Sequence, residues 1–94
     1  MRKPAVAGMF YPGTEGELRR LIGQLAPKQP RPKVRACGVV VPHAGYVYSG
    51  SVAADVYASI EGAQTFVLLG PNHYAAGSAV AVSEESWSTP LGTV

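Results

Sequence analysis

The sequence predicts an α/β fold with a mainly parallel sheet and a β-α-β crossover over residues 37–69. Two short apolar runs, at 37–41 and 65–69, have the continuous hydrophobic pattern of strands that are buried on both faces. The segment between them has apolar residues at helical spacing: Val52, Ala53, Val56, Tyr57 and Ile60. Two parallel strands need a crossover of about this length, and it is nearly always right-handed.

An amphipathic helix is expected before this unit. Thr14 and Glu17 have the spacing of a capping box, in which the Thr oxygen accepts an early amide hydrogen bond and the Glu reaches back. The apolar face follows at positions i, i+3, i+4 and i+7: Leu18, Leu21, Ile22 and Leu25. Pro27 is expected to end this helix, and residues 26–35 then form a proline-rich connector.

Turn residues and helix-capping residues indicate the bounds of the remaining predicted elements. Residues 43–50 are expected to form a loop. Ser49 or Ser51 is expected to cap the second helix, and Gly62 is expected to end it. The last expected elements are a loop over 70–77 and a candidate third strand over 79–83.

These elements do not complete a domain. A parallel sheet normally has helices on both faces, and the expected helices and strands are too few for that arrangement. We therefore expect residues 1–94 to be the N-terminal part of a single α/β domain, a fragment. Its uncovered apolar faces would favour self-association.

Composition narrows the class of protein. A hydrophobic content of 47% and a net charge of +2 are typical of a globular domain. No apolar run approaches the roughly 18 residues of a membrane span, so no membrane association is expected. We find no pattern of a secretory signal, and the single cysteine, Cys37, excludes an internal disulfide. The cytoplasm is therefore the expected location.

The basic residues all lie within residues 1–35. Four of them alternate with prolines in the connector: Lys28, Arg31, Lys33 and Arg35. This cluster lacks aromatic residues for stacking on bases, so we expect a solvated loop and no nucleic-acid partner. The alternative is a basic arm that contacts nucleic acid or phosphate.

Both histidines of the chain follow a predicted strand. His43 comes after VVVP, and His73 comes after VLLGPN. The carboxyl ends of parallel strands share one edge, where α/β sheets bind ligands, and neighbouring strands lie about 4.8 Å apart. Imidazole is a common metal ligand and acid–base group. We therefore expect His43 and His73 to share a cleft and to contact one metal ion or one substrate. The alternative is two unrelated loop histidines that bond to the backbone.

A complete metal site needs a third protein ligand, and the sequence offers no clear one. The nearby acids are expected to lie on a helix or in solvated loops: Asp55, Glu84 and Glu85. Tyr48 and Asn72 are candidate pocket residues, and Phe10 either covers the core or forms a pocket wall. No nucleotide-loop, zinc-protease or hydrolase motif is present, so no catalytic residue is assigned.

Four segments, in this order, closely resemble the Memo family, the protein B component of the AmmeMemoRadiSam system. They are PAVAGMFYPG (4–13), VVVPHAGYVYSGSVAADVY (39–57), VLLGPNHY (67–74) and WSTPLGTV (87–94). The resemblance implies a fold similar to the class III extradiol dioxygenases. Those enzymes hold Fe(II) with two histidines and a glutamate and split catechols with O₂.

The resemblance also implies roles for individual residues. His43 and His73 take the two histidine positions of that site. The family's later histidine, and its cysteine in place of the glutamate, belong to C-terminal parts that these residues do not include, since family members are roughly three times as long. Phe10 and Tyr48 match aromatic positions that line the family's pocket.

The expected function is that of a Memo-like protein with a dioxygenase-type cleft that binds a metal ion. Fe(II) with a redox role is the first expectation, and Cu or Zn are the alternatives. A thiolate in place of the carboxylate changes the metal preference, so dioxygenase activity does not follow from the fold. A second hypothesis is a non-catalytic module for a phosphorylated peptide or another anionic ligand. A third is an oxidoreductase that works with a radical-SAM partner.

Overall fold

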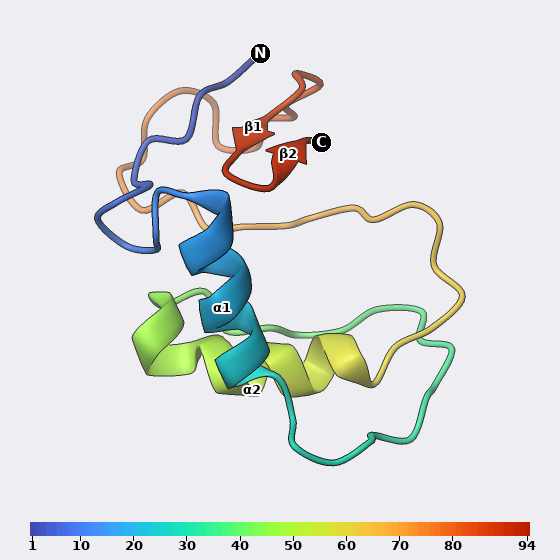
Figure 1. Cartoon of the computed structure of the whole chain (residues 1–94). Helices are drawn as coiled ribbons and strands as arrows, with labels where there is room; N and C mark the ends of the chain where they lie inside the picture. Colours follow the sequence, from blue (N-terminus) through green and yellow to red (C-terminus); the bar gives the residue numbers. More distant parts are fainter.

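The computed structural model describes residues 1–94 as two helices, a short hairpin and long connecting segments (Figure 1). Helix α1 spans Glu15–Leu25 and helix α2 spans Tyr46–Ala58. Strands β1 (Ser88–Thr89) and β2 (Gly92–Thr93) pair in an antiparallel hairpin. The hairpin lies near the N-terminal segment, and α1 leads from there to α2 (Figure 1). Neither helix has the length and apolar character needed to cross a bilayer.

Helix α1 confirms the predicted amphipathic helix, but its N-terminus differs from the predicted capping box. The Thr14 hydroxyl donates to the Glu17 carboxylate at 2.7 Å and makes no bond to the backbone. The hydroxyl is held by the charged acceptor because hydrogen bonds to carboxylates are the stronger ones. The apolar face meets little of the chain, and Leu18, which is 3% exposed, is the only buried residue.

Helix α2 begins earlier than predicted, so the loop expected over 43–50 is wrong for residues 46–50, which are helical, and only 43–45 lie outside the helix. Gly45 is the N-cap rather than Ser49 or Ser51, and the first turn is closed by backbone bonds to the Gly45 carbonyl. The Ser49 hydroxyl instead donates to the Ala44 carbonyl at 3.0 Å, as helical serines often do toward the preceding turn.

The two helices approach closely at one glycine. A Cβ atom on Gly50 of α2 would lie only 2.6 Å from Cδ1 of Leu25, at the end of α1. The missing side chain at Gly50 therefore allows the last leucine of α1 to rest on α2.

The strands predicted at 37–41, 65–69 and 79–83 do not form. Instead, Val34 and Ile60 make one parallel bridge, with hydrogen bonds from Val34 N to Ser59 O (2.8 Å) and from Glu61 N to Val34 O (3.0 Å). A fully apolar strand is stable when both of its faces are covered. Residues 65–69 are all exposed, so the covering layers that such strands require are absent here.

The basic connector packs on α2, so the prediction of a purely solvated loop is wrong in part. Arg31 makes two hydrogen bonds with one carboxylate oxygen of Asp55, at 2.9 and 3.2 Å. The Lys33 ammonium donates to the Ala58 carbonyl, in the last turn of α2. A cation at a helix C-terminus complements the partial negative charge of that end. The helix stops there, before Gly62, which forms a turn with a φ of +78°.

The N-terminus is attached to the hairpin. Arg2 forms a parallel bridge with Trp87, through bonds to the backbone of Ser86 and Ser88 at 2.8 Å each. The Arg2 guanidinium carbon lies 4.5 Å from the centre of the Trp87 ring, a cation–π contact. The radius of gyration of 14.6 Å exceeds the roughly 12 Å expected for a compact domain of this length, as the long connecting segments require.

Candidate functional site

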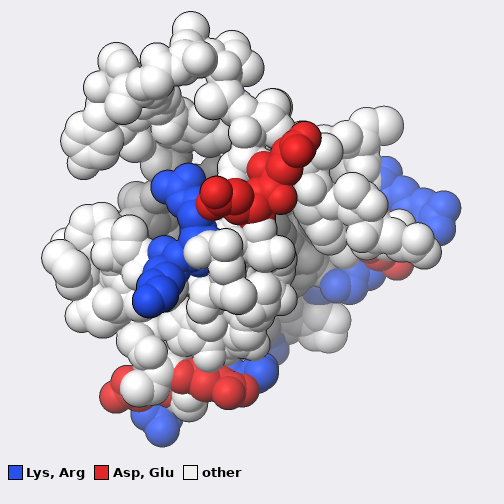
Figure 2. Space-filling view, turned by 90° about the horizontal axis from the view of Figure 1, so that it is seen from above, with Lys and Arg blue, Asp and Glu red and all other residues white.

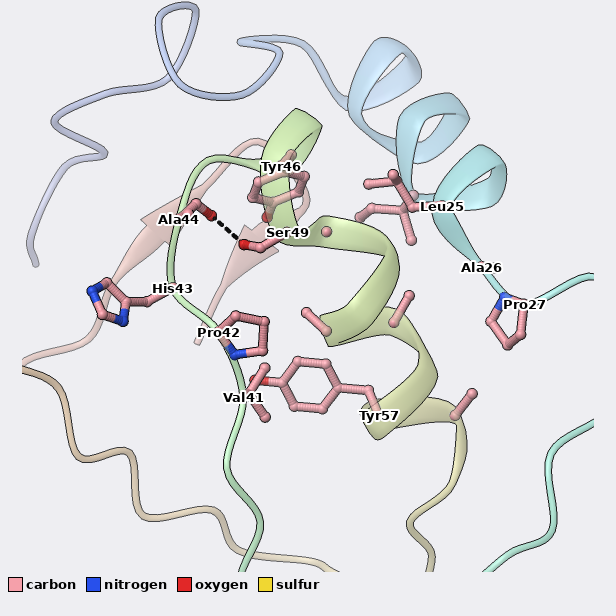
Figure 3. A pocket seen from close by; sticks show the side chains of 15 residues that line it. Leu25, Ala26, Pro27, Val41, Pro42, His43, Ala44, Tyr46, Ser49 and Tyr57 are labelled. Atoms are coloured by element: carbon pink, nitrogen blue, oxygen red, sulfur yellow. Dashed lines mark hydrogen bonds between the residues drawn. The ribbon is translucent and has the colours of Figure 1, made fainter.

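His43 lies immediately ahead of α2. It follows Pro42, and the residue after it, Ala44, is fixed by the hydrogen bond from Ser49. Figure 3 shows the His43 imidazole turned away from α2 and outward from the neighbouring apolar pocket. The first turn of the helix thus holds the residue next to His43, while the His43 side chain is exposed to solvent.

The structure brings the two histidines together. The ring centroids of His43 and His73 lie 5.2 Å apart, and the ring planes are tilted by 43°. Both residues are exposed. A tetrahedral ion at about 2.0–2.1 Å from one nitrogen of each ring would place the centroids about 5 Å apart. The separation therefore fits two ligands of one ion, and it also fits two donors to one anionic group.

A third protein ligand is not present beside this pair. The structure contains no group of three or more His, Cys, Asp or Glu side chains that could hold a metal ion. The Asp55 carboxylate is engaged by Arg31, and Cys37 is a free, exposed thiol outside any such group. The two imidazoles supply part of a donor set, and the remaining ligands would have to come from outside these residues.

Asn72 does not line either of the two main pockets, where it was expected. Its side-chain amide instead bonds twice to the backbone of Ala76, as donor to the carbonyl (2.9 Å) and as acceptor from the N–H (3.3 Å). These bonds close a short loop around His73. The sequence named Asn72 as a candidate, but its spacing to Ala76 carried no signal of this role.

Phe10 and Tyr48 do line one pocket together. This aromatic pocket has a volume of about 640 Å³ and is formed by the segment around Phe10, by Leu21 of α1 and by the first turn of α2. Tyr48 lies on α2 rather than in the expected loop, and it is 84% exposed. The two aromatic residues thus form an open hydrophobic wall on the side of α2 that meets the N-terminal segment.

A second pocket, of about 540 Å³, lies between the end of α1 and α2 (Figure 3). Leu25, Val41, Pro42 and Tyr57 surround it, and small residues of α2 form its floor: Gly50, Ala53 and Ala54. This apolar pocket was not predicted from the sequence, although the small residues of α2 at positions i, i+3 and i+4 were its available signal. His43 lies at the rim with its ring directed outward (Figure 3).

Tyr46 joins α2 to the N-terminal segment. Its ring lies 5.6 Å from that of Tyr11, centroid to centroid, at 33°. Burial raises the pKa of the Tyr46 phenol, and the phenols of Tyr11 and Tyr57 add to this effect. Tyr46 therefore keeps its proton at neutral pH and acts as a packed, uncharged wall of the apolar pocket.

Charged groups are dispersed over the surface. The face shown in Figure 2 is mostly uncharged, with basic and acidic side chains in small groups near one another. Arg31 with Asp55, and Arg19 with Glu15 at 2.8 Å, are the two ion pairs.

Two exposed histidines placed side by side, one of them directly ahead of a helix, describe a candidate two-histidine binding site. The family model of the Memo-like protein matches residues 2–94, and the chain belongs to this family.

Relatives of the same family match the whole chain. A MEMO1 family protein of Methanosarcina mazei is 50% identical, one of Archaeoglobus fulgidus 47% and one of Aquifex aeolicus 46%, each over 100% of this chain. The chain spans 35%, 35% and 36% of the length of these relatives, respectively. No solved structure matches the chain.

Proposed function

We propose that the chain contributes two ligands, His43 and His73, to a metal site in a dioxygenase-type cleft. The observation that carries this proposal is the 5.2 Å separation of the two imidazole centroids. The two rings come from segments that are far apart in the sequence. Family membership supports it, because the resemblance of the surrounding motifs to the Memo family implies these two ligand positions. The strands at 37–41 and 65–69 do not form in this structure, and we propose that they form where further parts of the domain cover both of their faces.

The two imidazoles of His43 and His73 would provide some, but not all, of the ligands that a metal ion needs. Neutral imidazole suits Zn(II), Cu and Fe(II), and two histidines with one further ligand form the usual site of non-heme iron enzymes. Bound Fe(II) would supply redox and O₂ chemistry. The residues of this chain would hold the ion from one side, and Phe10 and Tyr48 would offer a hydrophobic wall to an organic ligand. A role beside a radical-SAM partner is compatible with this proposal.

A second candidate function is supported by the exposure of both rings. Each exposed imidazole carries a ring N–H, and the two together could donate hydrogen bonds to a phosphorylated or carboxylated ligand. The aromatic pocket would accept the apolar part of such a ligand. Metal dependence separates the two functions, because a pair of hydrogen-bond donors binds its ligand without a metal ion.

The deciding measurement is metal stoichiometry after anaerobic loading with Fe(II), Cu(I) or Zn(II), on the longest natural chain that contains this sequence. We expect about one bound ion in the wild type, and none in His43→Ala or His73→Ala, because each imidazole supplies one of few ligands. Glu84→Ala and Glu85→Ala are matched controls that remove a carboxylate and should retain the ion. Binding that is indifferent to both histidine variants would refute the metal site and favour the anion-binding module.

A further inference from the structure

The segment that carries His73 has very little to hold it in place. Residues 62–85 contain no helix or strand, and nearly all of their side chains are exposed. The apolar residues of this segment are among the most exposed in the chain: Leu69 is 95% and Tyr74 is 91% exposed. Packing therefore cannot fix the direction of the His73 ring.

Hydrogen bonding in this segment is confined to one residue. No backbone–backbone bond involves residues 62–85, and their only side-chain bonds are the two between Asn72 and Ala76. The Ala76 N–H needs an acceptor and the Ala76 carbonyl needs a donor, so a single amide orientation of Asn72 satisfies both. Asn72 is thus the one hydrogen-bonded anchor on the His73 side of the site.

The closed loop also imposes an unusual backbone conformation. Ala75 has a φ of +49°, the only positive φ outside glycine in the chain. A residue with a Cβ atom adopts this left-handed region at a cost, and it stays there only when its surroundings require it. The two bonds from Asn72 to the next residue, Ala76, supply that requirement.

We infer that Asn72 is a positioning residue that fixes the backbone around His73 in the conformation that turns the His73 ring toward His43. This inference rests on the proposed two-histidine site and deepens it, because it assigns the residue that orders the more loosely held ligand. His43 does not depend on such a clamp, since the residue that follows it, Ala44, is bonded to Ser49 in the first turn of α2. The amide of Asn72 closes residues 72–76 around His73 and selects the loop conformation in which the two rings lie together.

Two readouts test the inference on the full chain. The first is the nuclear Overhauser effect between the ring protons of His43 and His73, recorded without metal on histidine-labelled protein. The second is the affinity for Zn(II). In Asn72→Ala we expect the ring-to-ring effect to be lost and the Zn(II) affinity to fall about 10-fold, the lower end for loss of a residue that orients a ligand. Circular dichroism should show α1 and α2 unchanged.

Three further variants separate positioning from general destabilisation. Asn72→Asp keeps the acceptor for the Ala76 N–H but loses the donor, so an intermediate ring-to-ring effect is expected. In the Asn72→Ala background, Ala75→Gly should partly restore it, because glycine adopts a positive φ without strain. Ser78→Ala is the matched control. It removes a hydroxyl that lies in the same segment and makes no hydrogen bond, so both readouts should stay at the wild-type level.

The outcomes distinguish this inference from the proposed function. If the rings contact each other in the wild type but no Zn(II) binds, the metal function fails and the positioning role stands. If Asn72→Ala retains both the ring contact and the affinity, the positioning role is overturned while the metal site stands. A wild-type chain without any ring-to-ring effect would overturn the inference directly.

Discussion

At the scale of single residues, Tyr46 shows how surroundings change chemistry. Burial raises the pKa of its phenol above the ordinary value of 10.0. Between that value and the higher pKa of the folded state, the folded chain keeps a proton that the unfolded chain has lost. The contribution of Tyr46 to the free energy of unfolding is therefore unchanged below pH 10.0, and it falls as the pH rises through this window.

We predict that Tyr46→Phe removes this alkaline loss of stability. The measurement is the urea midpoint of unfolding at a series of alkaline pH values, followed by circular dichroism. Tyr74→Phe, at a position that is 91% exposed, is the control and should keep the wild-type pH dependence. Equal alkaline losses in Tyr46→Phe and in the wild type would contradict the assignment.

The sequence predicted which candidate residues lie together better than the hydrogen bonds that hold them. His43 and His73 were found because each follows an apolar run and a proline, and the structure brings their rings together. Phe10 and Tyr48 were also named, and they line one pocket. The clamp formed by Asn72 could not be predicted, because it depends on the turn that residues 73–75 take between the two bonded positions.

At the scale of elements, two helical glycines distinguish the effect of helix propensity on stability from the effect of packing between the helices. Gly23 lies within α1, and a Cβ atom there would meet nothing within 4 Å. Gly50 lies within α2, where the same atom would meet Leu25 at 2.6 Å. The intrinsic preference of a helix for alanine over glycine is the same in both cases, so the difference between them measures the contact between the helices.

We predict that Gly23→Ala stabilises the chain by about 1 kcal/mol, the usual gain for this change in a helix interior. Gly50→Ala should give a smaller gain or a loss, because the Leu25 side chain must move away from α2. Urea unfolding followed by circular dichroism checks both. An equal gain in the two variants would show that Leu25 does not rest on α2.

The helix whose sequence signals lie within one segment was predicted correctly. The strands, which need partners from distant parts of the chain, were not. Helix α1 follows from its apolar spacing and from Pro27, all of which lie within one segment. The strands at 37–41 and 65–69 were predicted from apolar runs that describe a finished sheet. The structure forms only the bridge between Val34 and Ile60, since strand formation depends on covering layers that a local pattern cannot supply.

At the scale of the whole molecule, apolar surface is the dominant property. Leu18 is the one buried residue, while Val40 and Leu69, in the two apolar runs, are 93% and 95% exposed. Exposed apolar area of this kind marks an interaction surface. The relatives are nearly three times as long, and we propose that in them such runs are covered by further parts of the domain.

We predict that the chain on its own self-associates through these runs. Sedimentation velocity over a range of concentrations should show reversible or progressive growth of larger species. Val40→Lys and Leu69→Lys should each reduce it, because a charged side chain opposes burial of the run. Val94→Lys, at a position that is 81% exposed outside these runs, is the control and should associate like the wild type. A monomer at all concentrations would contradict the prediction.

The attachment of the N-terminus to the hairpin also determines which part of the chain each spectroscopic measurement follows during unfolding. Trp87 is the single tryptophan of the chain, and its ring lies under the Arg2 guanidinium, on the hairpin rather than on the helices. Its fluorescence therefore follows the release of the N-terminal segment, whereas far-ultraviolet dichroism follows α1 and α2. Because little packing joins these two regions, the two optical signals need not change together, and their separation would measure how far the chain departs from a single cooperative unit.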